Sequence, residues 1–200
     1  MTRFLLIRHA TNYTVGKRIA GRMPGVSLNE EGKDQANKVA ERLKGLDISA
    51  IYSSPMERAI ETAEPLATML NKEVTISEDF LEINFGDWTN LTIEELEKDP
   101  TFQLYNSFRS FTVIPNGELM LEAQTRFIKG LQKLCIQHPN ETVAVFTHGD
   151  LVKAAVAYYA GTPLDMFLRI EISPASVSII NVFEETAQIL LVNDTGEIKF

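Results

Sequence analysis

The sequence predicts a single α/β domain over residues 1–200, built on a largely parallel β-sheet. Strand-like and helix-like patterns alternate along the chain, and no repeat or linker interrupts them. Residues 4–8 and 142–147 are continuous apolar runs, which are typical of strands buried on both faces. Hydrophobic residues make up 44% of the chain and charged residues 23%, as in ordinary globular domains.

Apolar periodicity and turn residues place the individual elements. Ser54, Pro55 and Glu57 form a helix-start pattern in which Ser54 is the cap. The loop at residues 11–28 is longer than most connections, and long loops in compact domains are often functional. We expect strands at 4–8, 50–53, 73–77 and 142–147 with two more inside 177–192, and helices at 30–44, 55–70, 92–98, 101–108, 118–137 and 149–161.

Charge and composition exclude several classes of function. The net charge of −8 argues against a nucleic-acid-binding protein, which would carry a basic surface. No apolar run approaches the roughly 20 residues of a membrane helix, and the start of the chain lacks a signal-peptide pattern, so no membrane partner is expected. A single cysteine, Cys135, excludes an intramolecular disulfide. A cytoplasmic location fits this cysteine usage.

Two strands end in histidine. His9 follows the first strand directly after Arg8, and His148 follows the strand at residues 142–147. The strand at 50–53 ends just before the helix that carries Arg58. Because ligands of parallel α/β sheets bind beyond the carboxyl ends of the strands, these two histidines and two arginines are expected in one pocket.

This set of side chains suits the transfer of a phosphoryl group. Guanidinium groups match phosphate oxygens and stay charged, so Arg8 and Arg58 can stabilise the transition state. A neutral His9 can attack phosphorus, and a protonated His148 can donate to the phosphate. Glu82 is the candidate for the acid that protonates the leaving oxygen. Taken singly, each residue has an ordinary structural explanation, and Glu82 is one of 27 acidic residues.

The joint pattern resembles the histidine phosphatase superfamily, also called the phosphoglycerate mutase-like family. The resemblance covers nearly the whole chain through five ordered motifs. These are Arg8-His9-Ala10, the loop from Gly21-Arg22 to Leu28-Asn29 and Gly32, the Ser-Ser-Pro-x-x-Arg-Ala-x-x-Thr-Ala motif at residues 53–63, Glu82 before Phe85-Gly86-Asp87-Trp88, and Thr147-His148-Gly149.

The resemblance implies a three-layer α/β/α sandwich with a mostly parallel sheet and one antiparallel strand. It implies that His9 is the phosphorylated nucleophile, Glu82 the proton donor, and Arg8, Arg58 and His148 the phosphate pocket. No metal and no organic cofactor is implied. Asn12, Gly149 and Arg22 are further candidates for substrate binding, and Arg109, Tyr13 and Trp88 are candidates for the pocket wall.

This chain departs from the family pattern at two of these positions. Ala10 replaces the usual glycine, which should be tolerated if the backbone needs no positive φ. Asn12 replaces a hydroxyl residue that often contacts the phosphate. Outside these positions, the family often reads Gly-Gly-Glu-Ser after a proline, whereas Asn116-Gly117-Glu118-Leu119 lacks the serine. The roles of Asn12 and Glu118 are left open.

Three functions remain. The leading one is a metal-independent phosphatase acting on a small phosphorylated substrate, in the manner of a histidine acid phosphatase. The second is a phosphoglycerate-type mutase, and the third is a non-catalytic phosphate-binding or protein-interaction module. The sequence does not select between a small molecule and a phosphoprotein, and it leaves the oligomeric state open, with a homodimer as one option.

Overall fold

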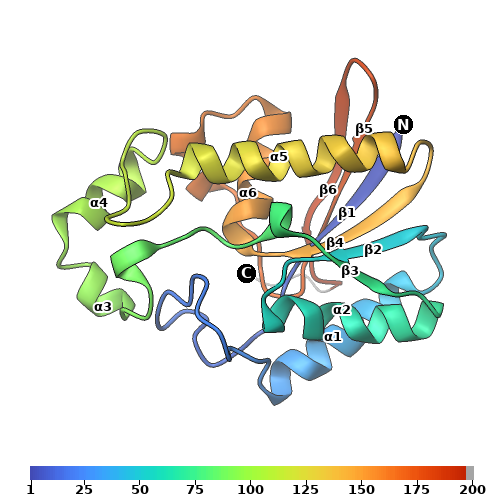
Figure 1. Ribbon diagram of the computed structural model, residues 1–200, viewed down its shortest axis with the longest axis horizontal. Helices are drawn as coiled ribbons and strands as arrows, with labels where there is room; N and C mark the ends of the chain where they lie inside the picture. The colour runs from blue at the N-terminus through green and yellow to red at the C-terminus, as the bar shows by residue number, and fades with distance from the viewer. Residues whose placement is uncertain (197–200) are drawn as a thin grey trace.

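The computed structural model describes residues 1–196 and contains, within them, a six-stranded sheet between two layers of helices (Figure 1). The strand order is β3-β2-β4-β1-β5-β6. The pairs β3–β2, β2–β4 and β4–β1 are parallel. β5 runs antiparallel to both of its neighbours, β1 and β6. The expected sandwich with one antiparallel strand is therefore confirmed. The strands are β1 (Thr2–Arg8), β2 (Ala50–Ser53), β3 (Val74–Ile76), β4 (Thr142–Thr147), β5 (Val177–Val182) and β6 (Ala187–Asp194).

The helices lie where periodicity predicted them, most of them with shorter bounds. They are α1 (Glu30–Leu43), α2 (Glu57–Leu70), α3 (Ile93–Leu96), α4 (Pro100–Ser107), α5 (Met120–Gln137) and α6 (Gly149–Ala160). The sequence did not indicate three short 3-10 helices, η1 (Glu78–Phe80), η2 (Gly86–Trp88) and η3 (Leu164–Arg169). In Figure 1, α3 and α4 form a small lobe beside the body that holds the sheet.

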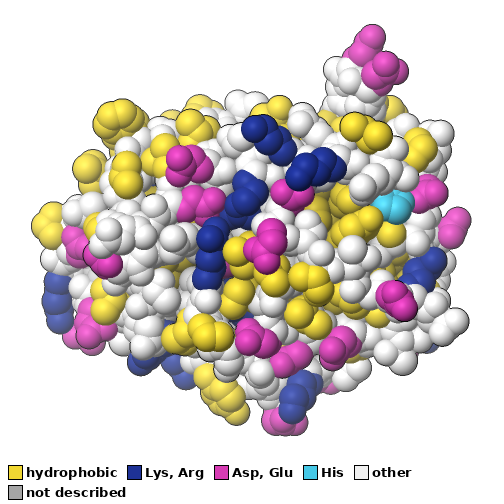
Figure 2. Space-filling view, in the orientation of Figure 1, with side chains coloured by type: hydrophobic (Ala, Val, Ile, Leu, Met, Phe, Trp, Pro, Cys, Tyr) yellow, Lys and Arg dark blue, Asp and Glu magenta, His cyan; other side chains and the backbone are white. Residues whose placement is uncertain are grey.

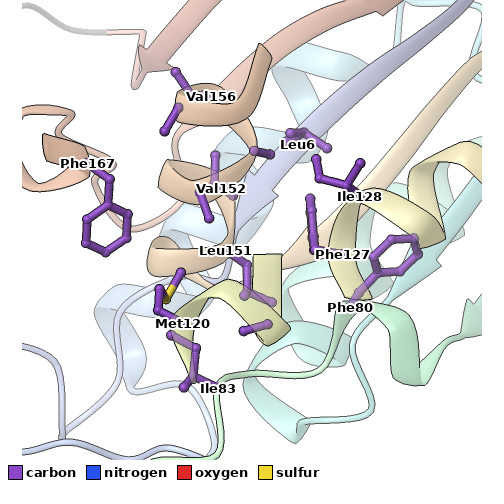
Figure 3. Close-up of a cluster of buried hydrophobic side chains, with 14 of the residues drawn as sticks. Leu6, Phe80, Ile83, Met120, Phe127, Ile128, Leu151, Val152, Val156 and Phe167 are labelled. Carbon is purple, nitrogen blue, oxygen red and sulfur yellow. The ribbon is translucent and has the colours of Figure 1, made fainter. Parts of the chain in front are cut away.

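Side-chain alternation along the central strands builds two cores. Leu5 and Ile7 of β1 pack with residues of α1 and α2, whereas Phe4 and Leu6 pack with residues of α5 and α6. Successive side chains of a strand point to opposite faces, so a continuous apolar run supplies both layers. Figure 3 shows the second core, where Leu6 lies near Phe127 and Val152.

The prediction that Ser54 caps α2 is wrong. The helix begins at Glu57, and Met56, which has no capping side chain, occupies the N-cap position. The Ser54 hydroxyl instead lies 2.8 Å from Nε2 of His148. The hydroxyl thus connects the end of β2 to the end of β4.

The surface carries mixed charge. The β5–β6 hairpin protrudes at the top of Figure 1, and acidic side chains cover its tip in Figure 2. Lys and Arg side chains form a band that begins over α5, with acidic side chains between them (Figure 2). No helix within residues 1–196 is both long enough and apolar enough to cross a membrane.

The packing of α1 against the loop after β1 gives a test of the fold. A Cβ built on Gly32 would lie 1.9 Å from the carbonyl oxygen of Thr11, whereas one on Gly45 would meet no atom within 4 Å. Gly32→Ala should lower the free energy of unfolding by about 1–3 kcal/mol, because the backbone must shift to relieve the overlap. Gly45→Ala is the matched control, and urea denaturation of both variants is the measurement. Equal stability of the two variants would contradict this packing.

Candidate active site

The pairing of β1 with β4 brings the two histidines together. Arg8 is in register with Thr147, and the backbone N–H of His9 donates to the Thr147 carbonyl at 2.8 Å. The rings of His9 and His148 therefore lie side by side, with centroids 5.3 Å apart. The N–H of Ser54 donates to the Phe146 carbonyl, which adds the end of β2 to the same edge.

A cavity of about 250 Å³ opens at this edge of the sheet. Five of the expected catalytic and substrate-binding residues line it, namely Arg8, His9, Arg58, Glu82 and Gly149. Arg109, a candidate for the pocket wall, also lines it. His148 is fully buried beside them. The lining residues are Arg8, His9, Thr14, Val15, Gly16, Arg18, Ile19, Ala20, Gly21, Arg58, Glu82, Phe85, Phe102, Tyr105, Arg109, Gly149, Asp150 and Lys153.

One hydrogen bond fixes the tautomer of His9. Its Nδ1 lies 2.8 Å from the carbonyl oxygen of Ala10. A carbonyl oxygen only accepts hydrogen bonds, so Nδ1 carries the proton and Nε2 keeps a lone pair. Burial, followed by the charges of Arg58 and Arg8, holds the pKa of His9 well below its usual value. The ring is neutral and has one nitrogen able to act as a nucleophile.

Backbone carbonyls hold both arginines of the expected phosphate pocket. Nη1 of Arg8 donates to Ile172 at 2.6 Å, and Nη2 of Arg58 donates to Gly21 at 2.8 Å. Within the described chain, Nε of Arg8 and Nη1 of Arg58 are buried without a hydrogen-bond partner. Unpaired buried N–H groups are costly, and both of these belong to residues that line the cavity. They are donors available to an anion.

Gly149 lets Arg8 approach the start of α6. A Cβ on Gly149 would meet Nε of Arg8 at 3.0 Å and its Cζ at 3.2 Å. Gly149 is the first residue of α6, where backbone N–H groups and the helix dipole favour anions. A residue without a side chain therefore places a guanidinium beside a helix N-terminus.

His148 is held on both ring nitrogens. Nη2 of Arg58 lies 3.3 Å from Nδ1, and because a guanidinium only donates, Nδ1 is an acceptor. Nε2 then carries the proton and donates to the Ser54 hydroxyl at 2.8 Å. Burial, Arg58, His9 and Arg8 lower the pKa of His148 well below its usual value, so the ring is neutral here.

Glu82 is an acid whose proton is retained near neutral pH. Its Oε2 lies 3.4 Å from Nδ1 of His148, and its Oε1 accepts the N–H of Ile83 at 2.9 Å. Burial raises the pKa of Glu82 to about 7, against the opposing charges of Arg58 and Arg8. A carboxyl with this pKa can both give up and take back a proton near neutral pH.

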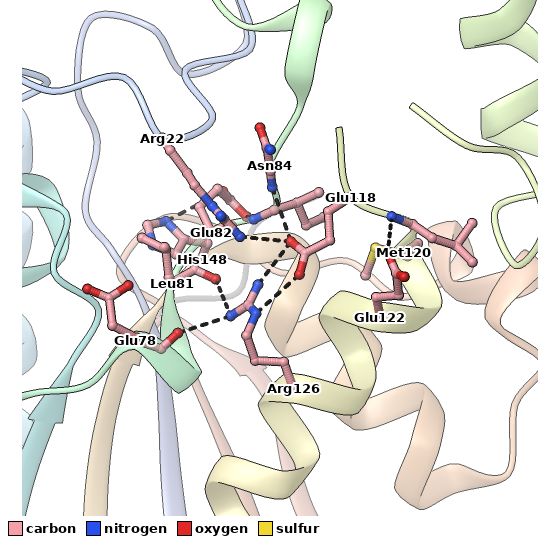
Figure 4. A network of polar contacts seen from close by, with 12 residues as sticks. Arg22, Glu78, Leu81, Glu82, Asn84, Glu118, Met120, Glu122, Arg126 and His148 are labelled. Atoms are coloured by element: carbon pink, nitrogen blue, oxygen red, sulfur yellow. Dashed lines mark hydrogen bonds and ion pairs between the residues drawn. The ribbon is translucent and has the colours of Figure 1, made fainter. Parts of the chain in front are cut away.

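A second carboxylate, Glu118, anchors the segment that carries Glu82 (Figure 4). Glu118 accepts from Arg22 at 2.9 Å, from Arg126 at 3.1 Å and from the N–H of Asn84 at 3.2 Å. Arg22 also donates to the Glu82 carbonyl at 2.7 Å. Arg126 reaches the carbonyl of Leu81 at 2.7 Å. This network fixes the backbone on both sides of the acid.

Several candidates from the sequence occupy other positions. Arg22 is engaged in this network and does not line the cavity. Asn12 is buried and accepts from the N–H and hydroxyl of Thr14. Trp88 is buried, donating to Asp99 at 2.8 Å, and Tyr13 is 73% exposed. Ala10 is not among the described residues that have a positive φ. The backbone at this position therefore accepts alanine in place of the family's glycine.

Sequence reasoning missed several residues that contact or line the site, among them Ser54, Asp150, Lys153 and Arg18. Ser54 was assigned to a helix cap, and Asp150 and Lys153 follow His148 on α6 without a motif of their own. Arg18 lies in the long loop, which the sequence flagged without placing its side chains. Helical spacing from Gly149 was the one signal that could have found Lys153.

Comparison with known proteins identifies the family. The model of the histidine phosphatase superfamily (branch 1) matches residues 4–195. Phosphoserine phosphatase 1 of Hydrogenobacter thermophilus is 31% identical over 98% of this chain and 93% of its own. The bifunctional protein Rv2228c of Mycobacterium tuberculosis is 33% identical over 98% of this chain, which spans about half (54%) of that relative's length.

Other relatives include phosphatases and a mutase. A metal-independent phosphoserine phosphatase of Arabidopsis thaliana is 34% identical over 77% of this chain and 67% of its own. A 2,3-bisphosphoglycerate-dependent phosphoglycerate mutase of Thermoplasma acidophilum is 29% identical over 89% of this chain and 86% of its own.

Two solved structures share the fold over nearly their full lengths. YhfR of Bacillus stearothermophilus has a TM-score of 0.91 at 30% identity and covers 97% of this chain and 98% of its own. The H9A mutant of phosphoserine phosphatase from Entamoeba histolytica, in complex with phosphoserine, has a TM-score of 0.88 at 28% identity, with 98% of each chain covered.

The raised pKa of Glu82 should make its contribution to stability depend on pH. The folded state holds the Glu82 proton more tightly than the unfolded state, so stability is highest below the ordinary value of 4.5 and falls as pH rises through about 7. Glu82→Gln should remove this decline. Relative to wild type, it should gain on the order of a few kcal/mol between pH 4.5 and pH 8. Urea denaturation across this range measures the difference, with exposed Glu78→Gln as control; parallel curves for wild type and Glu82→Gln would contradict the assignment.

The Glu118 network should set both the position and the proton affinity of Glu82. Glu118→Gln leaves the charges of Arg22 and Arg126 uncompensated, which favours the carboxylate form and lowers the pKa of Glu82. We expect a loss of about 1–3 kcal/mol in stability and an alkaline limb of the activity profile that moves to lower pH. Glu122→Gln, which removes a carboxylate of α5 that accepts from the N–H of Leu119, is the control. An unchanged pH profile in Glu118→Gln would reduce the network to a structural role.

Proposed function

The chain belongs to the histidine phosphatase superfamily, and we propose that it is a phosphatase that hydrolyses a small phosphomonoester through a phosphohistidine on His9. One observation carries the proposal. A neutral imidazole with a free Nε2 lines the same cavity as two arginines that keep buried, unpartnered donors in the described chain. A nucleophile and stabilising charge around a phosphate are what phosphoryl transfer requires.

In the first step, Nε2 of His9 attacks phosphorus as the bond from phosphorus to the ester oxygen breaks. The lone pair of Nε2 forms the new N–P bond, and the leaving oxygen takes the bond electrons together with the proton of Glu82. The alcohol departs and the phosphoryl group stays on His9. The hydrogen bond from Nδ1 to the Ala10 carbonyl keeps the ring oriented during the attack.

In the second step, water attacks the phosphoryl group from the side opposite His9. The Glu82 carboxylate accepts a proton from this water, the N–P bond breaks, and the electron pair returns to Nε2. Inorganic phosphate leaves, and Glu82 is again protonated. One carboxyl serves as acid and then as base, which its pKa of about 7 permits.

Fixed cations supply the charge stabilisation in both steps. Arg8, Arg58 and the first N–H groups of α6 would surround the equatorial oxygens. A phosphate dianion beside His148 opposes the cations that lower its pKa, so substrate binding favours protonation of Nδ1. Arg58 would then release Nδ1, which would donate to the phosphate while Nε2 stays bonded to Ser54. With these groups in place the proposed reaction needs no metal ion.

The size of the cavity favours a small substrate. About 250 Å³ accommodates a phosphate with a short organic chain, and the loop at residues 14–21 and α4 both contribute to its walls. One relative is a mutase, and this favours one alternative. In that alternative the phosphoryl group passes from His9 to a second phosphoglycerate molecule and not to water.

Replacing the nucleophile tests the mechanism directly. His9→Ala should lower the hydrolysis of p-nitrophenyl phosphate, measured in the presence of a chelator, by at least about a thousandfold. It should also abolish the acid-labile phosphoenzyme that we expect to trap when wild type is quenched during turnover of labelled substrate. His138→Gln is the control, because His138 lies away from the cavity and bonds to Tyr52 and Glu141.

Retained turnover in His9→Ala would rule out covalent catalysis by this residue. Loss of wild-type activity in chelator, with recovery on adding a divalent ion, would contradict a metal-independent reaction. Interconversion of phosphoglycerates without hydrolysis would identify a mutase instead.

The proton donor is tested by varying the leaving group. Glu82→Gln should slow the first step about 10²–10⁴-fold for alkyl phosphates, whose leaving oxygen needs a proton. The loss should be far smaller for p-nitrophenyl phosphate, because nitrophenolate leaves without protonation. Single-turnover release of the alcohol or phenol isolates this step, with Glu78→Gln as control. Equal losses for both substrates would assign the proton to another group.

A further inference from the structure

The outer face of α5 carries an apolar side chain that the fold leaves in solvent. Ile136, in the last turn of the helix, is 83% exposed, the highest value among the large hydrophobic residues of the described chain. It stands one helical turn beyond Gln132 and directly follows Cys135, and these two residues line a groove on the flank of the helix. An exposed apolar residue needs no explanation when it stands alone, but this one borders a surface that can receive it.

The groove lies between α5, α6 and the β5–β6 hairpin and has a volume of about 420 Å³. The lining residues are Gln132, Cys135, Tyr158, Tyr159, Val182, Phe183, Glu184, Thr186 and Ala187. In Figure 1 the hairpin passes behind the C-terminal half of α5 and protrudes beyond the helix. Tyr158 of α6 is 50% exposed and Phe183 of the hairpin 40% exposed, so the groove presents apolar surface to an approaching side chain.

Opposite charges flank the groove and Ile136. Lys129 and Lys133 stand about two turns and one turn before Ile136 on the outer face of α5, and both are exposed. Glu184 and Glu185 form the exposed tip of the hairpin. Figure 2 shows basic side chains over α5 and acidic side chains at the hairpin tip on the same face of the molecule. The surface therefore combines an apolar centre with a basic and an acidic margin.

The arrangement of these groups makes the surface complementary to itself. Gln132 and Cys135 lie on the flank of α5 that faces the groove, whereas Lys133 lies toward the opposite flank and stays exposed in its ion pair with Asp79 at 2.8 Å. If α5 of a second copy runs antiparallel in the groove, its Ile136 enters the groove and its lysine flank faces the acidic hairpin tip. A two-fold axis repeats both contacts in the other direction, because each copy offers the same patch.

We propose that the outer face of α5 and the β5–β6 hairpin form the interface of a two-fold dimer of this chain, in which Ile136 of each copy enters the groove of the other. The inference is independent of the proposed function. Val182 at the hairpin pairs with Thr2 at the start of β1, whereas His9 follows the end of β1. The interface therefore lies toward the edge of the sheet opposite the cavity beside His9, and it leaves that cavity open.

Charge favours a second copy over an unrelated acidic or basic protein. Each copy supplies the carboxylates that face the lysines of the other, so neither set of charges requires a different partner. Two chains of net charge −8 repel each other at long range, and the local pairing of opposite charges opposes this repulsion at the contact. An apolar centre with a polar rim is also the usual composition of a specific protein–protein interface.

Substitution of Ile136 tests the apolar contact. We expect sedimentation velocity to show a dimer of wild type at micromolar concentrations. Ile136→Glu should weaken the association by at least about a hundredfold, because a carboxylate would be buried twice in one interface. Met69→Glu, which changes an exposed apolar residue of α2 outside this surface, is the matched control and should remain dimeric. Both residues are exposed, so circular dichroism should show both variants folded.

Charge reversal tests the contact between the lysines and the hairpin tip. Lys129→Glu/Lys133→Glu makes both margins acidic, and Glu184→Lys/Glu185→Lys makes both basic, so each double variant alone should associate at least about tenfold more weakly. An equimolar mixture of the two should dimerise again, since every contact of the mixed dimer joins opposite charges. Recovery on mixing is a result that a loss of folding could not produce.

Three results would overturn this interface. Wild type that stays monomeric up to about 1 mM forms no such dimer. A dimer that survives Ile136→Glu lies on another surface, such as the edge strand β6 with its exposed Leu190 and Leu191. A mixture of the two charge variants that associates no better than either alone refutes the reciprocal contact between α5 and the hairpin.

Discussion

The parallel pairing of β1 with β4 is the interaction on which the site depends. It places His9 beside His148 through the hydrogen bond from the His9 N–H to the Thr147 carbonyl. The same register sends Phe4 and Leu6 to the α5–α6 core and Leu5 and Ile7 to the α1–α2 core. A slip of one residue would exchange the faces of β1, so the packing of both cores protects the alignment of the two histidines.

The site carries an excess of positive charge, because arginine and lysine side chains outnumber carboxyl groups among the described residues that line the cavity. The carbonyls of Ile172 and Gly21 hold Arg8 and Arg58, and these are dipoles without net charge. Burying such cations costs free energy, which hydrophobic packing elsewhere has to offset. An anion that binds here would therefore stabilise the folded protein as well as react in it.

Local sequence predicted the elements and the four basic residues of the site because both follow from short-range patterns, whereas Glu82 was identified through the family motif that ends at Trp88. Apolar runs identify buried strands, and the residues after parallel strands share one edge. The remainder depends on distant contacts. Ser54 looks like a helix cap until His148 is placed 2.8 Å away, and Arg22 looks like a ligand for phosphate until Glu118 is placed beside it. Arg109 lies in a lobe whose orientation no local pattern specifies.

Two opposing effects determine the pKa of Glu82. Arg58 and Arg8 favour its ionised form, and in water they would lower the pKa of a carboxyl below its ordinary value. Removal of water opposes them more strongly, so the pKa of Glu82 rises to about 7. Desolvation therefore lets an acid persist among the cations that the proposed phosphate site requires. The Glu118 network protects this balance, since it fixes the backbone of Glu82 and neutralises Arg22 and Arg126, which would otherwise favour the carboxylate.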